Sequence, residues 1–135
     1  MRIVLDTNVL ITYFWEGSAV REIMQNKELM FFTSQKALQE LLKYKKHVMK
    51  KARITSKLFD ALLDDMKMVI PFVPNKEYSD KMAVALKISP DKDDAEFIAL
   101  AMKLKCPLWS NDKALSNIKT LQVITTHDVI RLLVP

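Results

Sequence analysis

Two aspartates in this sequence follow apolar runs, where a side chain can reach the functional edge of a sheet. Asp6 ends the run from Ile3 to Leu5, and Asp112 comes shortly after the run from Pro107 to Trp109. Continuous apolar runs of this length are typical of strands buried on both faces of a parallel sheet. Open parallel sheets carry their chemistry just beyond the carboxyl ends of the strands, so the two carboxylates are expected to meet there.

Two further acids lie on predicted helices. Asp94 opens a helix predicted over 94–104 and precedes Phe97 and Ile98 by three and four residues. This spacing puts it at the N-terminal end of the face that packs on the sheet. Glu40 lies in the middle of a long helix predicted over 35–50, at the margin of its apolar stripe.

Carboxylates gathered at one place repel one another, and either protonation or a bound cation must relieve the repulsion. A set of oxygen ligands without cysteine or histidine nearby in sequence favours Mg²⁺ or Mn²⁺. Such ions act on phosphate esters by holding the phosphate, activating a water and neutralising the leaving oxygen. The same aspartates also suit helix N-termini, and Glu40 suits a solvated helix face. Spacing alone leaves both interpretations open.

The composition excludes several classes of protein. The chain has 135 residues, half of them hydrophobic, which predicts a single domain over 1–135. No apolar run approaches the roughly 18 residues of a membrane span, and Asp6 interrupts the first run too early for a secretory signal. We therefore expect a soluble, cytoplasmic protein, with its one cysteine, Cys106, buried as a small hydrophobe. The single glycine, Gly17, excludes the glycine-rich loops that cradle nucleotide phosphates.

Strand and helix patterns alternate along the whole chain. Strands are predicted over 2–5, 29–32, 68–73, 106–109 and 121–125, and helices over 8–15, 18–24, 35–50, 57–66, 75–86, 94–104, 111–115 and 126–133. This alternation predicts an α/β fold of three layers, with a parallel sheet between helices.

The motifs, taken in order, resemble those of the PIN-domain family, which are metal-dependent nucleases that include the VapC-type toxins of toxin–antitoxin pairs. The similarity runs over nearly the whole chain and rests on Ile3–Leu10 (strand, Asp, Thr, Asn), Thr33–Leu41 with its Glu40, Asp93–Ala101 with its Asp94, and Leu108–Leu115 with its Asp112. Each motif alone is weak, but the four in this order make a specific signal.

The resemblance implies a roughly five-stranded parallel sheet of Rossmann-like topology and an acidic pocket where the strand order switches. It implies Mg²⁺- or Mn²⁺-dependent endoribonuclease activity, in which RNA phosphodiesters are hydrolysed. Carried over by residue, the catalytic metal ligands are Asp6, Glu40, Asp94 and Asp112, and the side chains that orient them are Thr7, Asn8 and Ser110. The VapC-like members further imply a homodimer and a small antitoxin protein as partners.

A basic segment lies next to the second motif. Between Leu41 and Ser56 the chain carries six basic residues and no acidic one, within a net charge of +5. Lys36, Lys43 and Lys50 lie on the Glu40 side of the predicted helix and are candidates for guiding an RNA backbone to the metal. The alternative is an ordinary solvated helix face.

The sequence also allows three other functions. One is a non-catalytic RNA- or protein-binding module on the same fold, and another is an RNA-processing nuclease outside toxin–antitoxin systems. A haloacid-dehalogenase-type phosphatase also places an Asp after its first strand, but it needs a second Asp two residues on, where this chain has Asn8. The phosphatase is therefore the weakest of the three.

Overall fold

A five-stranded, all-parallel sheet forms the centre of the protein in a computed structural model that describes residues 1–134. The strand order is β3-β2-β1-β4-β5. The strands are β1 (Arg2–Leu5), β2 (Met30–Ser34), β3 (Phe72–Val73), β4 (Leu108–Trp109) and β5 (Val123–Ile124). In the register of the central strands, Val4 pairs with Phe32 on one side and with Leu108 on the other. This confirms the predicted α/β fold class.

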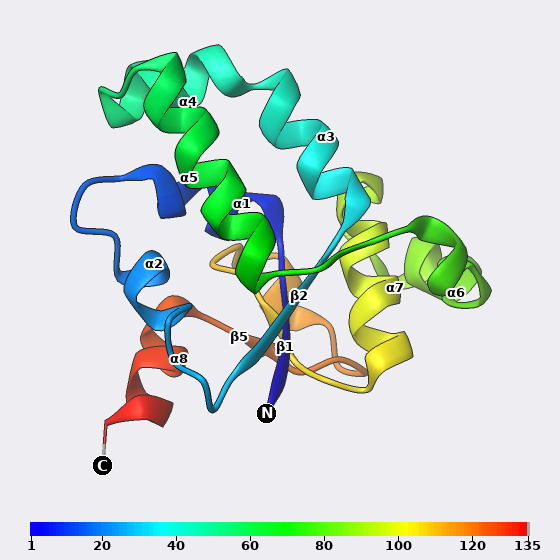
Figure 1. Ribbon diagram of the computed structural model, residues 1–135. Coiled ribbons are helices and arrows are strands. Elements are labelled where there is room, and N and C mark those ends of the chain that lie inside the picture. The colour runs from blue at the N-terminus through cyan, green and yellow to red at the C-terminus, as the bar shows by residue number, and fades with distance from the viewer. Residues whose placement is uncertain (135) are drawn as a thin grey trace.

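Helices cover the sheet on both sides. They are α1 (Thr7–Ile11), α2 (Ala19–Ile23), α3 (Gln35–Lys43), α4 (Lys45–Ala52), α5 (Ser56–Val69), α6 (Met82–Ile88), α7 (Ala95–Leu104) and α8 (Thr126–Leu133), with short 3₁₀ turns η1 (Thr12–Phe14), η2 (Asn75–Glu77), η3 (Ser79–Lys81), η4 (Lys92–Asp94) and η5 (Leu115–Asn117). In Figure 1, α6 and α7 lie to the right of β1 and β2, α2 and α8 lie to the left, and α3, α4 and α5 arch above. Within residues 1–134, no helix is long and apolar enough to cross a membrane.

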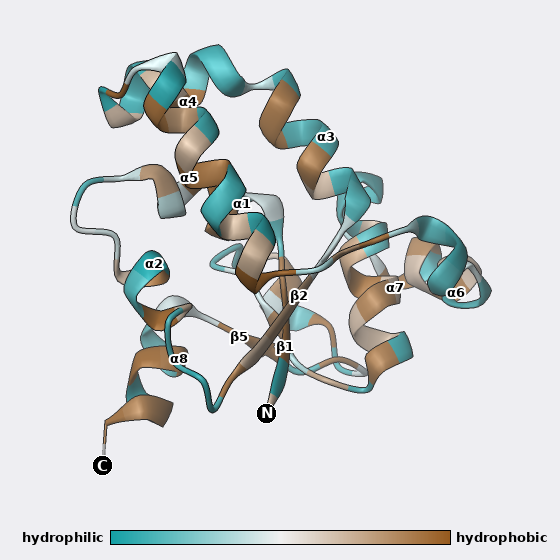
Figure 2. Cartoon of the chain, in the orientation of Figure 1, coloured by the Kyte–Doolittle hydropathy of each residue, from teal (hydrophilic) through white to brown (hydrophobic). Residues whose placement is uncertain are grey.

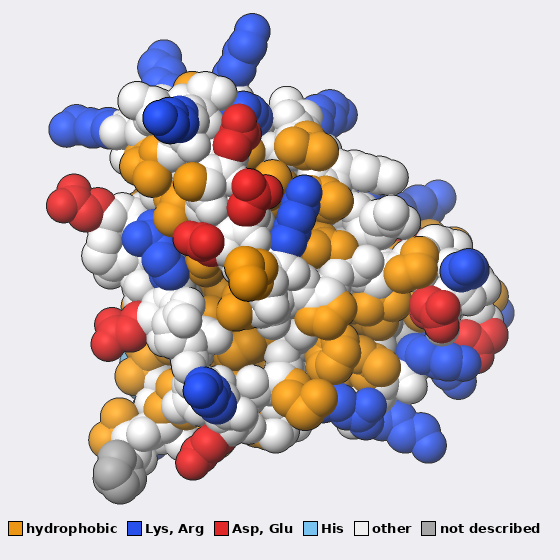
Figure 3. Space-filling view, in the orientation of Figure 1, with side chains coloured by type: hydrophobic (Ala, Val, Ile, Leu, Met, Phe, Trp, Pro, Cys, Tyr) orange, Lys and Arg blue, Asp and Glu red, His pale blue; other side chains and the backbone are white. Residues whose placement is uncertain are grey.

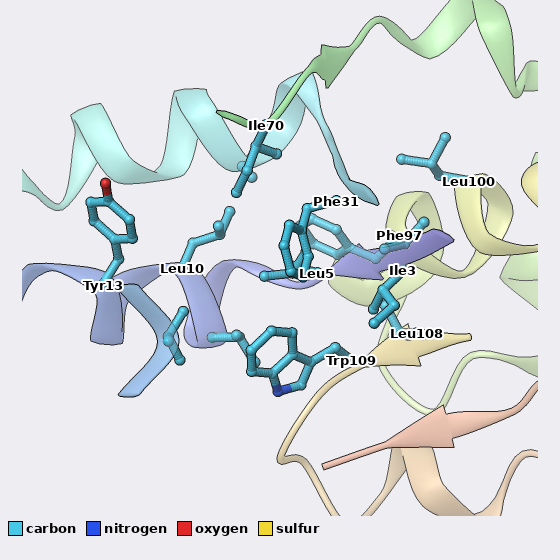
Figure 4. Packing of buried hydrophobic residues seen from close by; sticks show 14 of the residues in the cluster. Ile3, Leu5, Leu10, Tyr13, Phe31, Ile70, Phe97, Leu100, Leu108 and Trp109 are labelled. Carbon is cyan, nitrogen blue, oxygen red and sulfur yellow. The ribbon is translucent and has the colours of Figure 1, made fainter. Parts of the chain in front are cut away.

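The core is built around β1 and α7. Ile3, Val4 and Leu5 are completely buried, as expected for a central strand with both faces covered. The Phe31 and Trp109 rings lie 6.2 Å apart across the sheet, and Figure 4 shows them packed with Leu5. Figure 2 shows where hydrophobic and hydrophilic residues lie along the chain: the central strands are mostly brown, and α4 is mostly teal.

The prediction of a single helix over 35–50 is wrong. The structure has two helices there, α3 and α4, with a break at Tyr44. After the break, α4 packs against α5. The ammonium of Lys45 contacts Asp60 at 2.8 Å and lies 5.3 Å from the centre of the Phe59 ring, and Val48 is fully buried. These tertiary contacts stabilise the broken arrangement over one continuous helix. Repulsion between lysines spaced three and four residues apart further destabilises the continuous helix.

Several boundaries also differ from the predictions. The strand predicted over 68–73 is shorter, because α5 continues to Val69 before β3 begins. The last helix is capped by Thr125, one residue earlier than expected, in a reciprocal capping arrangement with Asp128. A turn followed by η5 replaces the helix predicted over 111–115. Cys106 is half-buried rather than buried.

Candidate functional site

The strand order of the sheet reverses beside β1, because β2 and β3 lie on one side of it while β4 and β5 lie on the other. A crevice at such a switch point is where open α/β sheets bind ligands. Here a hollow of about 210 Å³ opens at this point, and it is lined by Asp6, Thr7, Asn8, Glu40, Asp91, Asp93, Asp94, Phe97 and Asp112. The structure thus brings the four acids predicted from the sequence to one place.

Asp6 is a buried acid among the residues that line this hollow. The residue is 4% exposed. Its Oδ1 accepts a 2.9 Å hydrogen bond from the amide of Val9, so it is also the N-cap of α1. Burial raises the pKa of Asp6, and hydrogen bonds from Ser110 and Val9 partly offset that rise. The capping role and a place in the site are therefore compatible in one residue.

Glu40 reaches the hollow from α3. The hydroxyl of Thr7 donates a 3.1 Å hydrogen bond to Oε1 of Glu40. Thr7 itself is 6% exposed, so this bond fixes the carboxylate from a rigid position. Burial raises the pKa of Glu40, whereas the bond from Thr7 and the charge of Lys36 lower it.

Asp94 faces the other acids from the start of α7. It occupies the N-cap position but makes no side-chain capping bond, which leaves its carboxylate available. Burial, followed by the charges of Asp6, Asp91 and Asp112, raises the pKa of Asp94 to about 6. The neighbouring Asp93 has a side chain that is 87% exposed. Asp94 is therefore the member of the pair that lies among the other acids.

Asp112 is carried by the loop after β4. The backbone amide of Asp112 donates a hydrogen bond to the hydroxyl of Ser110 at 3.1 Å. Oδ1 of Asp112 accepts a hydrogen bond from the amide of Ala114 at 2.9 Å. Ser110 is 1% exposed and lies close enough to Asp6 to lower the pKa of that carboxyl, so it neighbours two of the acids. Of the residues predicted to orient the acids, Thr7 thus contacts a carboxylate, whereas Ser110 bonds the backbone of Asp112.

Asn111 anchors this loop, a role that the sequence analysis did not identify. Its amide nitrogen donates to the hydroxyl of Thr126 at 2.9 Å, and its amide oxygen accepts from the backbone of Thr126 at 2.8 Å. The pair is separated by 15 residues in the chain, so no local pattern reveals it. By contrast, Asn8 lines the hollow, but its side chain makes no hydrogen bond among those described for residues 1–134.

The basic residues fall into two groups. Lys36 lies beside the hollow, where its ammonium donates a 2.7 Å hydrogen bond to the backbone carbonyl of Asp93. Lys43 and Lys50 are exposed on α3 and α4, away from the residues that line the hollow. Figure 3 shows Lys and Arg side chains projecting at the end of the molecule where α4 lies.

The donor set of the hollow fits a hard divalent cation. Its ligand atoms are carboxylate, hydroxyl and amide oxygens, and the raised pKa values of Asp6, Glu40 and Asp94 reflect burial and mutual repulsion that a cation would relieve. Within residues 1–134, no three acidic, histidine or cysteine side chains are grouped closely enough to hold a metal ion by themselves. Mg²⁺ usually keeps several waters and is bound by one or two carboxylates.

Comparison with known proteins agrees with this geometry. A family model described as "PIN domain" matches residues 4–129. The fold is similar to a crystal structure of VapBC2 from Rickettsia felis bound to a DNA fragment from their promoter, with a TM-score of 0.63 and 14% identity over 93% of this chain and 98% of that chain. Comparison with curated protein sequences gives no match. With four acids in one hollow and a family model that spans almost its full length, this chain belongs to the PIN-domain family, whose members are generally divalent-metal-dependent nucleases.

Proposed function

We propose that this protein is a Mg²⁺- or Mn²⁺-dependent endoribonuclease. The observation that carries the proposal is the convergence of Asp6, Glu40, Asp94 and Asp112 on one hollow at the switch point of the sheet. If Asp6 and Asp94 only capped helices, nothing would require them to meet Glu40 and Asp112 in one place. A cation bound between the four carboxylates would relieve their repulsion, which explains why they lie together in one half-buried place.

Each residue has a defined part in the proposed reaction. The four carboxylates would hold the cation, directly or through water, while Thr7 positions Glu40 and Ser110 holds the backbone of Asp112. When bound, the cation supplies charge neutralisation at the phosphate and lowers the pKa of a water. Water attacks the phosphorus opposite the 3′-oxygen and loses a proton, and the P–O3′ bond breaks as the leaving 3′-oxygen takes up a proton. The products carry 5′-phosphate and 3′-hydroxyl ends. Asn8 lines the hollow, and its side-chain amide makes no hydrogen bond among those described for residues 1–134, so it can contact substrate.

RNA is the proposed substrate because exposed lysines lie on the helix that carries Glu40 and on the helix that follows it. A polyanion would be repelled by the carboxylates alone, and lysines along the approach offset that repulsion. Lys43 is exposed on α3, the helix of Glu40, and Lys50 is exposed on α4, the next helix. Exposed Tyr44, at the break between α3 and α4, is placed to stack on a base.

We further propose that the protein is the toxin of a VapBC-type toxin–antitoxin pair. The fold similarity to VapBC2 over nearly the full length of both chains supports this assignment. It implies a cytoplasmic homodimer that a small antitoxin protein inhibits. A search for a short open reading frame just upstream, followed by co-expression of its product, tests it. Relief of growth inhibition is expected, and growth inhibition that persists in its presence would favour an RNA-processing nuclease.

The nuclease proposal is tested with an end-labelled structured RNA incubated with Mn²⁺, with Mg²⁺ and with EDTA. Cleavage is expected with either metal, none with EDTA, and recovery when Mn²⁺ is restored in excess. End-group analysis is expected to find 5′-phosphates. Cleavage that survives EDTA contradicts the proposal. RNA that is bound without metal and never cut would instead support a non-catalytic binding module.

A further inference from the structure

Lys36 differs from Lys43 and Lys50, the two other lysines predicted to guide RNA, because its ammonium hydrogen-bonds a residue outside its own helix. Its Nζ donates a 2.7 Å hydrogen bond to the backbone carbonyl of Asp93 and lies 3.8 Å from Oδ1 of the same residue. The Lys36 side chain is 23% exposed, whereas that of Asp93 is 87% exposed. The firm contact is thus with the backbone carbonyl, which has little freedom to move away.

This contact joins the two elements that carry facing acids. Glu40 lies one helical turn after Lys36 on α3, so the two residues share a face. Asp94 directly follows Asp93 and ends η4. The hydrogen bond therefore connects the helix of Glu40 to the segment of Asp94 at a point adjacent to both acids.

The segment before α7 is otherwise held mainly by its own residues. The Asp91 carboxylate accepts from the amide of Asp93 at 2.9 Å, the Asp91 carbonyl accepts from the amide of Asp94 at 3.0 Å, and the Ser89 hydroxyl donates to the Asp91 carbonyl. Among the side-chain hydrogen bonds of residues 1–134, the bond from Lys36 is the one that joins residues 89–94 to α3. Its loss would leave the distance between α3 and η4 set by packing alone.

The position of Lys36 is unfavourable for the helix itself. It is the second residue of α3, and a cation in the first turn opposes the helix dipole. The Ser34 N-cap provides no side-chain bond that compensates. A lysine here weakens α3 locally, so its contribution lies in the contact across the hollow.

We propose that Lys36 is a positioning residue that fixes the segment of Asp94 against the helix of Glu40 and so sets the width of the metal site. This inference rests on the proposed metal-dependent function and adds a residue to it. It also changes the role predicted for Lys36 from the sequence, since a side chain bound to Asp93 is not free to follow an RNA backbone.

Replacing Lys36 changes metal affinity in one direction if the residue positions ligands and in the other direction if it acts only through its charge. Removing a cation beside a cation site strengthens metal binding if charge alone matters. Removing a residue that orients metal ligands weakens it, typically by about 10- to 100-fold. Lys36→Met keeps most of the aliphatic stem but removes both the charge and the donor, so the two roles predict opposite signs.

The experiment is a calorimetric titration of Mn²⁺, without RNA, into the wild type, Lys36→Met, Lys36→Arg and Lys103→Met. Affinity is expected to fall about tenfold in Lys36→Met and to recover for the most part in Lys36→Arg, which retains a donor and the charge. Lys103→Met is the matched control, because Lys103 pairs with Asp80 at 3.0 Å in the last turn of α7, at the opposite end from Asp94. It is expected to bind Mn²⁺ as the wild type does.

Hydrogen–deuterium exchange provides a readout that does not depend on metal. Amides of residues 92–96 are expected to exchange faster in Lys36→Met than in the wild type, and to be unchanged in Lys103→Met. Unchanged exchange there, or Mn²⁺ affinity equal to or tighter than wild type in Lys36→Met, overturns the inference even if RNA is cleaved. Weaker Mn²⁺ binding by Lys36→Met in a protein that cleaves no RNA upholds the inference and refutes the nuclease. A wild type that binds no Mn²⁺ contradicts both.

Discussion

The hydroxyl of Thr7 donates a 3.1 Å hydrogen bond to Oε1 of Glu40, and this bond joins the residue after the first buried acid to the acid on α3. The two residues are 33 positions apart in the chain. The bond shows that the strand–helix junction at Asp6 and the middle of α3 form one unit. Thr7 therefore acts on the site indirectly, by positioning the carboxylate of Glu40.

Replacing Thr7 with Val tests this link. Val keeps the branched shape but removes the hydroxyl, so Glu40 loses its fixed orientation. We expect Mn²⁺-dependent cleavage to fall about tenfold and the free energy of unfolding to fall by about 1 kcal/mol. Thr7→Ser, which retains the hydroxyl, is expected to recover most of the activity. Equal loss in both variants would mean that the methyl group, and not the hydrogen bond, matters.

Asp6 has two roles that substitutions can separate. Asn and Asp are comparable N-caps, so Asp6→Asn is expected to leave thermal stability unchanged or higher, because it also removes a buried charge. Asp6→Ala is expected to lose about 1 kcal/mol of stability with the capping bond from Val9. Both variants are expected to lose cleavage by more than about 100-fold, since a ligand worth several kcal/mol in the transition state is gone. Thermal unfolding and initial cleavage rates measure the two effects.

The pKa of Asp94, raised to about 6 from 3.8, predicts a pH dependence of metal binding. Protonation competes with the cation, so Mn²⁺ affinity is expected to fall about tenfold per pH unit below about pH 6. Calorimetric titrations between pH 7.5 and 5 measure it, with the buffer's heat of ionisation subtracted. Constant affinity across this range would contradict the assignment of Asp94 as a ligand.

The same raised pKa has the opposite effect on the metal-free protein. The folded state binds the proton more tightly than the unfolded chain, so stability contributed by this group is present below pH 3.8 and is lost as the pH rises to about 6. Asp94→Asn is therefore expected to stabilise the metal-free protein at pH 7. The gain is about 1 kcal/mol, because solvent screens this half-buried side chain. Destabilisation by this substitution would refute the repulsion described among the acids.

RNA binding through α3 and α4 is tested with Lys43→Gln combined with Lys50→Gln. The slope of log affinity against log salt concentration is expected to fall by about 1.4 for two lost phosphate contacts on single-stranded RNA. Fluorescence anisotropy with the inactive Asp6→Asn background avoids cleavage during the measurement. The control combines Lys27→Gln with Lys105→Gln, the same charge change beside the amino ends of β2 and β4, opposite the site. An equal slope change in the control would mean that net charge alone attracts RNA.

The sequence predicted the fold class and the meeting of the four acids for a physical reason. Apolar runs ending in Asp6 and shortly before Asp112 indicate strands of a parallel sheet, and the carboxyl ends of such strands share one edge. The break at Tyr44 was not predictable, because it depends on the packing of Lys45 and Val48 against α5. The same holds for Asn111 with Thr126 and for Lys36 with Asp93, which join residues 15 and 57 positions apart.

The cleavage of RNA by a double variant tests the central claim most directly. Asp6→Asn with Asp94→Asn removes the negative charge of two carboxylates from different elements while preserving side-chain size and the cap of α1. At saturating Mn²⁺, and with thermal unfolding confirming that the variant is folded, we expect cleavage of an end-labelled structured RNA to be lost while the wild type cuts it. Metal-dependent cleavage retained by the double variant would show that these carboxylates do not hold the catalytic cation.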